Sequence, residues 1–320
     1  MLEIRDLQVS YGRADRGLIA VRCVDLDVPT GQAVALVGES GSGKSTVALS
    51  VMRLITPPTG QIERGTIQLE GVDLLQLKSV DMRRVLHEKI GFIPQDPNSA
   101  LDPLFTIGRQ VDETLSATIR GSARRQTIAS LLESLGVANA AERLDSYPHE
   151  FSGGMKQRVA IATALARNPK LIIADEPSTA LDVTTQLGIL CLIDELRRER
   201  NLSLLLITHD LSVARLLCQQ VVVLYAGQVV ERGPIQEVMG SPRHPYTRAL
   251  VGAIPHLATP RTRLLSIPGQ PPAPGEVRAG CPFAPRCPLA DSRCIRENPQ
   301  LVRYDRVEVA CWNARVEDGS

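Results

Sequence analysis

The chain lacks several features that would place it in a broad class at once. Its formal net charge is only +1, which gives no electrostatic reason to expect nucleic acid as a partner. No apolar run of about 18 residues occurs, so no segment is expected to span a membrane. The first residues have no apolar core of the signal-peptide type, and no internal repeat is visible. We therefore expect a cytoplasmic protein, which could still sit on the inner face of a membrane through a partner.

The apolar pattern alternates between strands and helices, as in an α/β protein with a mostly parallel sheet. The run 33–37 is short and continuously apolar, as expected for a buried parallel strand. A helix is predicted from Gly43 to about Ile55, because Pro57 and Pro58 cannot continue it. Further strands are predicted at 2–10, 18–28, 171–174, 202–208, 221–225 and 228–231 and within 66–95, and further helices at 184–198 and 213–218.

Two regions depart from this alternation. Residues 96–169 have apolar side chains at helical spacing, which predicts a helical subdomain inserted into the α/β core. The stretch 267–275 is rich in proline and glycine and is expected to be a loop. The residues after it are expected to be short, irregular and cysteine-bearing. The predicted division is a domain of residues 1–255 followed by a C-terminal extension of residues 256–320.

A phosphate-binding motif follows the buried strand at 33–37. Residues Gly38–Ser45 match G-x-x-x-x-G-K-[ST] in full, between a strand and a helix, as the motif requires. Glycines let backbone N–H groups wrap the phosphates, Lys44 reaches the outer phosphates, and Ser45 offers a hydroxyl to Mg²⁺. We call Gly38–Ser45 the phosphate loop. It predicts ATP binding.

Polar residues end three other apolar strands. Asp175 and Glu176 follow the strand 171–174, and they are predicted to hold Mg²⁺ and to orient or deprotonate the attacking water. Gln95 and His209 also end apolar strands. Because ligands of α/β sheets bind at the carboxyl ends of strands, these residues are predicted to lie at the nucleotide site.

A second glycine segment, Ser152–Gly154, precedes Asp175 and is here called the signature segment. Consecutive glycines let the backbone turn tightly and approach a ligand closely. A helix starting just after them would point its first N–H groups outward and attract an anion. The chain would then have two phosphate-binding surfaces, and the second has no ligand unless another subunit brings one.

Together these motifs resemble the ATPase subunits of ABC transporters, in order and spacing, over about residues 1–255. That resemblance implies an ABC-type ATPase core with an antiparallel β subdomain, and two subunits joined head to tail with each ATP between them. The signature segment would contact the γ-phosphate of the facing subunit. Glu176 would be the general base, assisted by Lys44, Gln95 and His209. Gln95 would also link the site to the membrane subunits, His209 would contact the γ-phosphate, and Tyr11 would stack on adenine. The remaining implied site residues are Tyr11, Gly38, Ser40, Gly41, Gly43, Thr46, Ser152, Gly153, Gly154 and Asp182 at the nucleotide or the dimer contact, with Ser45, Gln95 and Asp175 at Mg²⁺.

Within that family the chain resembles the dipeptide/oligopeptide importers. The residue after the signature segment is Met155, where glutamine is usual, and the stretches Pro148–Glu150 and His244–Thr247 are typical of this branch. The resemblance implies a second ATPase subunit, which could be a paralogue, two membrane permeases and an extracytoplasmic solute-binding protein. Nickel, heme or glutathione importers, a soluble ABC ATPase and a redox-sensing regulator remain alternatives.

The sequence contains seven cysteines. Cys23, Cys191 and Cys218 are isolated in apolar surroundings and are expected to be small buried side chains. Four others, Cys281, Cys287, Cys294 and Cys311, lie in the C-terminal extension, without the close pairs typical of structural zinc sites. Four thiolates suit Zn²⁺ or an iron–sulfur cluster. The resemblance to the importers implies a [4Fe–4S] cluster, with zinc or unligated thiols as alternatives.

Overall fold

The computed structural model forms two compact units. The first comprises residues 1–28, 33–75 and 207–320, and the second comprises residues 29–32 and 76–206. The residues it describes are 1–12, 17–115, 119–177, 182–254, 267–272, 276 and 279–314. Ala180 and Leu181, which directly precede the predicted contact residue Asp182, lie outside these ranges. Each unit is described by itself below.

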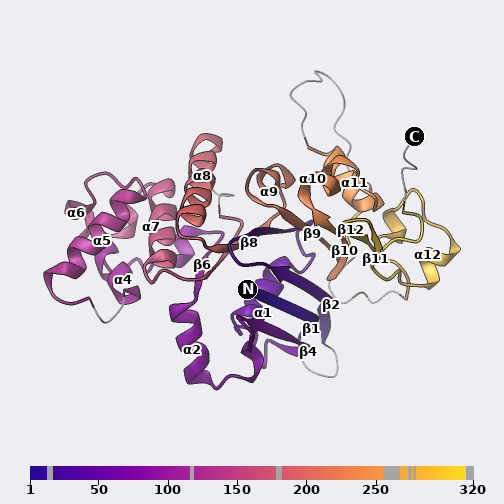
Figure 1. Ribbon diagram of the computed structural model, residues 1–320, viewed down its shortest axis with the longest axis horizontal. Coiled ribbons are helices and arrows are strands. Elements are labelled where there is room, and N and C mark those ends of the chain that lie inside the picture. The colour runs from indigo at the N-terminus through magenta and orange to yellow at the C-terminus, as the bar shows by residue number, and fades with distance from the viewer. Residues whose placement is uncertain are drawn as a thin grey trace. The chain divides into compact units, whose positions relative to one another are not determined.

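An antiparallel sheet forms one part of the first unit (Figure 1). Its order is β2-β1-β4-β5, and the bounds of β2 agree with the predicted strand at 18–28. Inward-facing apolar residues such as Ile4 and Leu26 are fully buried. The antiparallel subdomain is therefore confirmed. Its strands are β1 (Leu2–Tyr11), β2 (Leu18–Val28), β4 (Gly60–Leu69) and β5 (Val72–Asp73), followed by the turn η1 (Leu74–Gln76).

The other strands of the first unit run in the order β11-β12-β10-β9-β3. β3 (Ala33–Val37) is buried along its whole length and pairs in parallel with β9 (Gln220–Tyr225). β9 and β10 (Gln228–Pro234), the two strands predicted at 221–225 and 228–231, form a hairpin that turns at Ala226 and Gly227, both of which have positive φ. The helices of this unit are α1 (Lys44–Val51), α9 (Leu211–Leu217), α10 (Ile235–Gly240), α11 (Pro245–Gly252) and α12 (Ser292–Arg296).

Helix α1 starts after Gly43 as predicted but stops at Val51 rather than near Ile55. Arg53 has a φ of 52°, a left-handed conformation that cannot continue an α-helix. Proline therefore did not end this helix. The chain had already turned before Pro57.

The C-terminal extension contains more regular structure than expected. β11 (Val302–Tyr304) and β12 (Val307–Val309) form a hairpin, and β12 pairs with β10 through Glu231 and Val309. Val309 is fully buried. Strands of three residues are too short to show a period of two, so the sequence pattern did not reveal them.

The second unit contains the inserted helical subdomain. The described part of the predicted range 96–169 contains five α-helices and one 3-10 helix, so the helical insert is observed. Helix α2 was missed because only Met82 of its residues is buried. β6 and β7 pair in parallel, with Ile90 opposite Leu171. The bounds are α2 (Ser79–Glu88), β6 (Ile90–Ile93), α3 (Pro97–Ala100), α4 (Ile107–Thr114), α5 (Ser122–Ser134), α6 (Ala140–Arg143), η2 (Pro148–Glu150), α7 (Gly153–Leu165), β7 (Leu171–Asp175), α8 (Val183–Glu199) and β8 (Ser203–Thr208), the last of which begins in this unit.

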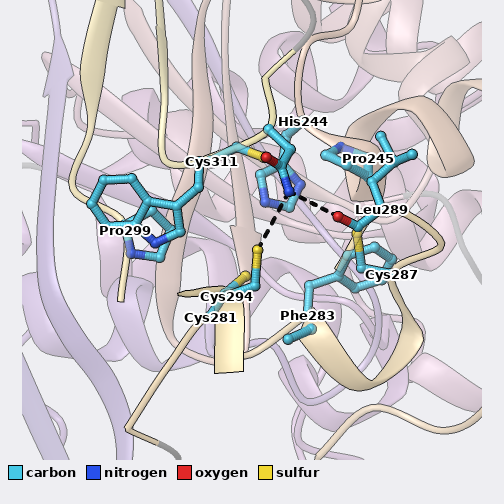
Figure 2. Close-up of a pocket in the computed structure, with 12 residues that line it drawn as sticks. His244, Pro245, Cys281, Phe283, Cys287, Leu289, Cys294, Pro299 and Cys311 are labelled. Carbon is cyan, nitrogen blue, oxygen red and sulfur yellow. Dashed lines mark hydrogen bonds between the residues drawn. The ribbon is translucent and has the colours of Figure 1, made fainter. Parts of the chain in front are cut away.

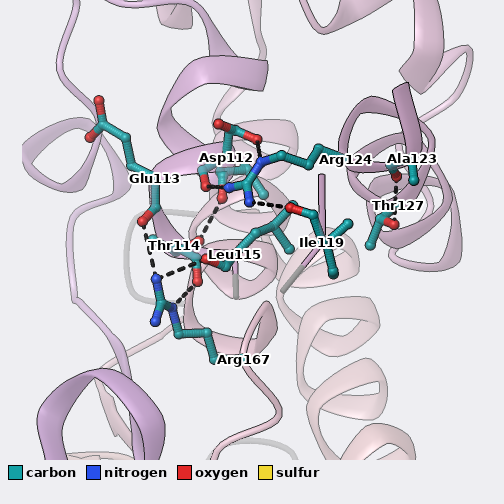
Figure 3. A network of polar contacts seen from close by, with 10 residues as sticks. Asp112, Glu113, Thr114, Leu115, Ile119, Ala123, Arg124, Thr127 and Arg167 are labelled. Atoms are coloured by element: carbon teal, nitrogen blue, oxygen red, sulfur yellow. Dashed lines mark hydrogen bonds and ion pairs between the residues drawn. The ribbon is translucent and has the colours of Figure 1, made fainter. Parts of the chain in front are cut away.

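Two arginines hold the end of α4 (Figure 3). Arg124 of α5 donates to the carboxylate and to the backbone carbonyl of Asp112, each at 2.5 Å. Arg167, just after α7, donates to the carbonyl of Leu115 at 2.9 Å and also to that of Thr114. Helix ends leave carbonyls without intrahelical partners, and these guanidinium groups satisfy them. α4, α5 and α7 are thereby tied into one helical body.

Two of the three isolated cysteines differ from expectation. Cys218 is buried, but Cys23 and Cys191 are exposed. Cys23 lies at an irregular position of β2 with a φ of 47°, and Cys191 lies on the outer side of α8. Apolar sequence neighbours did not imply burial, because successive positions face opposite sides of a strand and different sides of a helix. Within the described part of the chain, no helix is long and apolar enough to cross a membrane.

Candidate functional site

The phosphate loop connects β3 to α1 in the first unit. A Cβ added to Gly38 would lie 2.2 Å from the backbone oxygen of Leu224, so the backbones of the two segments approach too closely for any side chain. Gly43 is the N-cap of α1 and has a φ of 103°. A Cβ there would lie 2.7 Å from the oxygen of Ala20. Both glycines are therefore required by contacts and backbone conformation as well as by the phosphate they are predicted to surround.

Lys44 folds back onto the phosphate loop. Its side-chain amine donates to the carbonyl oxygens of Gly38 at 2.7 Å and Glu39 at 2.9 Å, and the residue is only 6% exposed. These bonds hold the cation over the loop, where the predicted ligand carries negative charge. Ser45, in the first turn of α1, is exposed and available to a ligand. Ser40 and Gly41 also face solvent.

Tyr11 ends β1 beside the start of α1. Its hydroxyl lies 3.3 Å from the hydroxyl of Thr46, with which it shares a hydrogen bond. This contact brings the aromatic ring next to the phosphate loop. It agrees with the position predicted for a residue that stacks on adenine, although the stacking itself stays a prediction.

Asp175 and Glu176 lie at the carboxyl end of β7 in the second unit. Asp175 is the last residue of the strand. Glu176 has a φ of 45°, a left-handed conformation that is uncommon for a residue with a side chain. Its carboxylate accepts a hydrogen bond of 3.0 Å from the side-chain amide of Gln95, two residues beyond the end of β6. The two strand ends therefore bring the predicted base and the predicted glutamine into direct contact.

The signature segment begins a helix, as predicted. Ser152 is the N-cap of α7, and its hydroxyl accepts from the N–H of Met155 at 3.4 Å. Gly153 and Gly154 form the first turn, and Ser152 and Gly153 are exposed. Free N–H groups of this turn are therefore accessible to an anion.

The two glycines differ from expectation in one respect. Both glycines are part of the first turn of α7 and do not adopt the left-handed conformation of a tight turn. Their role is to leave space, since a Cβ on Gly154 would lie 2.7 Å from Thr185 of α8. Absence of side chains also keeps the exposed end of α7 flat enough for a close approach.

Asp182 and His209 occupy two further predicted positions. Asp182 is the N-cap of α8, and its carboxylate accepts from the N–H of Thr185 at 3.0 Å. That backbone hydrogen bond lowers the pKa of Asp182, because it stabilises the charged form. His209 follows β8 directly and is exposed. Both residues lie at ends of elements, a position that the sequence predicted for His209.

The four cysteines of the C-terminal extension line one pocket (Figure 2). We call it the four-cysteine pocket. The amide of Asn313 donates to the carbonyl of Leu289 at 2.8 Å and lies 3.7 Å from the sulfur of Cys294. Sequence spacing alone did not show that these cysteines would meet, but the structure brings them together. The lining residues are His244, Pro245, Cys281, Phe283, Ala284, Cys287, Leu289, Cys294, Pro299, Cys311, Trp312 and Asn313.

Burial keeps these thiols neutral. It raises the pKa of Cys281 and of Cys311 to about 11, and it also raises the pKa of Cys287 and Cys294. His244 is buried as well, which lowers its pKa to about 3. The Nδ1 atom of His244 accepts from the N–H of Tyr246, whereas its Nε2 has no partner among the described residues. The N–H at Nε2 is therefore a buried donor without a partner, and it lines the same pocket as the four thiols. A bound group that accepts hydrogen bonds would satisfy it.

The predicted metal centre is not present in preformed geometry. Among the residues that the structure describes, no group of three or more His, Cys, Asp or Glu side chains is arranged to hold a metal ion. Neither the iron–sulfur cluster nor the zinc alternative is therefore confirmed. The donor set still fits a soft metal, because four cysteines gather in one pocket and metal binding itself removes the thiol protons.

One group beside the phosphate loop was missed by the sequence reasoning. Glu39 makes an ion pair with Arg286, between oxygen and nitrogen atoms 2.6 Å apart. The N–H of Glu39 also donates to the hydroxyl of Tyr246 at 2.8 Å. No sequence signal connects residues this far apart in one chain. The contact with Arg286 depends on the docking of the C-terminal extension, and the contact with Tyr246 depends on the placement of α11.

Comparisons with known proteins agree with these motifs. Residues 21–179 match the family described as ABC transporter, and residues 230–294 match the oligopeptide/dipeptide transporter, C-terminal region. The dipeptide transport ATP-binding protein DppD of Escherichia coli is 43% identical over 303 residues, covering 94% of this chain and 92% of DppD. The oligopeptide transport ATP-binding protein AppD of Bacillus subtilis is 42% identical over 306 residues, covering 95% and 93%.

Solved structures show the same likeness. A dimeric ATP-binding cassette in a post-hydrolysis state, bound to ADP and Pi, has a TM-score of 0.65 with this chain. The two are 29% identical, and the match covers 73% of this chain and 99% of the other.

Gly43→Ala tests the geometry of the phosphate loop. The added methyl group collides with the oxygen of Ala20 at a φ that disfavours any side chain, so the start of α1 must shift. A misplacement of about 1 Å can lower a reaction rate about 100-fold, which shows how strongly such sites depend on geometry. We expect at least a tenfold loss of ATP affinity, measured with a fluorescent ATP analogue. Gly71→Ala is the matched control, because Gly71 also has positive φ but open space around it. Equal affinity of both variants would contradict this account.

Proposed function

Because the chain belongs to the ATP-binding subunits of the oligopeptide/dipeptide ABC transporter family, we propose that it energises the import of dipeptides or oligopeptides. Family membership makes the chain an ATPase whose hydrolysis drives transport. The family predicted from the motifs is confirmed by relatives that match nearly the whole chain. The roles of individual residues, given next, extend this conclusion.

The exposed start of α7 is the observation that carries the proposal. Ser152 and Gly153 present free N–H groups to solvent, which is the arrangement that binds a phosphate. In the proposed assembly that phosphate is the γ-phosphate of ATP held by a second subunit, and Asp182 lies at the contact. The dimeric state of the solved cassette supports this head-to-tail pairing.

Each remaining residue is assigned one role. Lys44 and the backbone of the phosphate loop bind the phosphates, and Tyr11 stacks on adenine. The hydroxyl of Ser45 and the carboxylate of Asp175 are oxygen donors of the kind Mg²⁺ requires, with Gln95 close to the same ion. Glu176 activates the attacking water. His209 contacts the γ-phosphate.

The hydrogen bond from Gln95 to Glu176 supports two of these assignments. It connects the proposed base with the residue proposed to sense the membrane subunits. Docking of a permease beside Gln95 would change the orientation of the base directly. ATP binding closes the proposed pair of subunits, and hydrolysis separates them again.

Glu176→Gln should stop turnover while ATP still binds. The amide keeps the size of the side chain but cannot accept a proton, so we expect a loss of about 100-fold or more in the rate of phosphate release. Closed subunit pairs should accumulate with ATP, as measured by size-exclusion chromatography. Glu133→Gln, an exposed position of α5, is the control and should hydrolyse ATP normally. Near-normal hydrolysis by Glu176→Gln would remove this residue as the base.

We further propose that the four-cysteine pocket holds a [4Fe–4S] cluster, with Zn²⁺ as the alternative. The gathering of four thiols in one pocket supports this assignment, and so does the unpartnered Nε2 of His244, which could donate to a sulfur atom of the bound group. A cluster would stabilise four thiolates that burial otherwise keeps neutral. Its place in the C-terminal extension favours a structural or sensing role over electron transfer.

Metal analysis separates these alternatives. Protein purified without oxygen should be brown and contain about four iron atoms per chain, the number that four thiolates hold in such a cluster. Cys281→Ser should lose the iron and the colour, whereas Cys218→Ser, a buried cysteine elsewhere in the same unit, should retain both. Zinc without iron would establish the zinc alternative, and neither metal would leave the thiols unligated.

The proposed partners are a second ATPase subunit, two permeases and a solute-binding protein outside the membrane. The names of DppD and AppD support dipeptides or oligopeptides as the cargo. The subunit would then lie on the cytoplasmic face of the membrane through its permeases. Nickel, heme or glutathione import remains the second candidate for the cargo, because the binding protein and permeases make that choice.

Isolation from membranes tests the assembly. We expect the tagged chain, extracted in mild detergent, to bring down two membrane proteins and a related ATPase, identified by mass spectrometry. Washing the membranes with salt alone should leave most of the chain attached. A soluble homodimer without any membrane protein would favour the alternative of a soluble ABC ATPase.

A further inference from the structure

We propose that Arg286 of the C-terminal extension is a positioning residue for ATP binding, acting on the phosphate loop through Glu39. This inference rests on the proposed ATP site at Gly38–Ser45 and adds a residue that lies outside the nucleotide-binding motifs described above. Arg286 would neutralise a carboxylate inside the phosphate loop, which would otherwise repel the phosphates. The extension would then contribute directly to nucleotide affinity.

Glu39 is held on three sides. Its carboxylate receives two hydrogen bonds from the guanidinium group of Arg286, at 2.6 and 3.1 Å. Its N–H donates to the hydroxyl of Tyr246, and its carbonyl oxygen accepts from Lys44. The residue after Gly38 is therefore fixed by groups from both ends of the chain, which restricts the path of the phosphate loop.

Arg286 is itself locked in place. Its side chain is 5% exposed, and it also donates to the carbonyl of Pro268 at 2.8 Å and to the hydroxyl of Tyr225 at 3.2 Å. A guanidinium group with this many fixed acceptors has little freedom to move. The Glu39 side chain is 25% exposed, so the pair lies in a region of reduced screening where charge matters more than at an open surface.

A cluster of aromatic rings supports the same contact. Phe283 packs against Tyr246 and Tyr225, with ring centres 5.4 and 5.3 Å apart, and all three rings are buried. Phe283 also lines the four-cysteine pocket. Arg286 therefore sits on a short segment between Cys281 and Cys287, with the pocket on one side and the phosphate loop on the other.

The sign of the effect follows from charge. ATP carries several negative charges, and a bare carboxylate within the phosphate loop would repel them. Arg286 cancels that charge. Loss of Arg286 should therefore weaken ATP binding, and removal of the Glu39 charge as well should restore much of it. A contact that only stabilises the fold predicts no such restoration.

Four full-length variants test this directly. We expect Arg286→Gln to weaken ATP binding about fivefold to tenfold at low salt, a size typical of coupled groups in one network, measured by titration calorimetry. The loss should shrink as salt rises. Glu39→Gln should bind ATP at least as well as the unchanged chain. The double variant should regain most of the affinity, and Arg286→Lys should lie between Arg286→Gln and the unchanged chain.

Arg232→Gln is the matched control. Arg232 pairs with Glu308 at 2.7 Å and so joins β10 to the extension without touching the phosphate loop. This variant should lower the melting temperature but leave ATP affinity unchanged. Unchanged affinity of Arg286→Gln, or no recovery in the double variant, would overturn the inference.

Two other outcomes also decide the question. If Arg286→Gln does not fold, Glu39→Gln removes the same ion pair from the other side, and a tenfold loss of affinity in that variant would contradict the proposed sign. Failure of the unchanged chain to bind ATP would instead refute the proposed function, so the two failures are distinguishable.

Discussion

The phosphate loop depends on close contact between backbones that leaves no room for side chains. Gly38 meets the carbonyl of Leu224, and Gly43 meets the carbonyl of Ala20, at distances that exclude a Cβ. β9 and β2 provide these carbonyls, so the loop takes its shape partly from strands distant in the sequence. Lys44 then uses the carbonyls of the loop itself as acceptors. Binding of phosphate therefore begins with packing, and the hydrogen-bond donors are oriented as a result.

The active groups divide between the two units, and each unit presents an incomplete site. The first has the phosphate loop and Tyr11, whereas the second has Glu176, Gln95 and the signature segment. The hydrogen bond between Gln95 and Glu176 lies wholly within the second unit. The residues proposed for catalysis and for coupling to the membrane thus lie in the second unit, whereas those proposed to hold the nucleotide lie in the first.

Sequence reasoning succeeded where motifs and periodicity are local. The phosphate loop, the strand ends at Asp175 and His209, and the helix start at Ser152 all depend on neighbours within a few residues. It failed where tertiary contacts decide. The polar surface helix α2 has one buried residue, the hairpin of β11 and β12 is too short for a pattern, and Arg286 reaches Glu39 only through docking of the extension. Exposure of Cys23 and Cys191 belongs to the same class of failure.

The contact between Glu39 and Arg286 also has a consequence for synthesis. The phosphate loop leaves the ribosome well before Tyr246 and Arg286, which follow it by more than 200 residues. An unfinished chain therefore has a phosphate loop with an uncompensated carboxylate and without its outer wall. With the proposed role of Arg286, such a chain would bind nucleotide more weakly than one in which Arg286 has docked, so the order of the sequence would delay ATP binding until that segment is made.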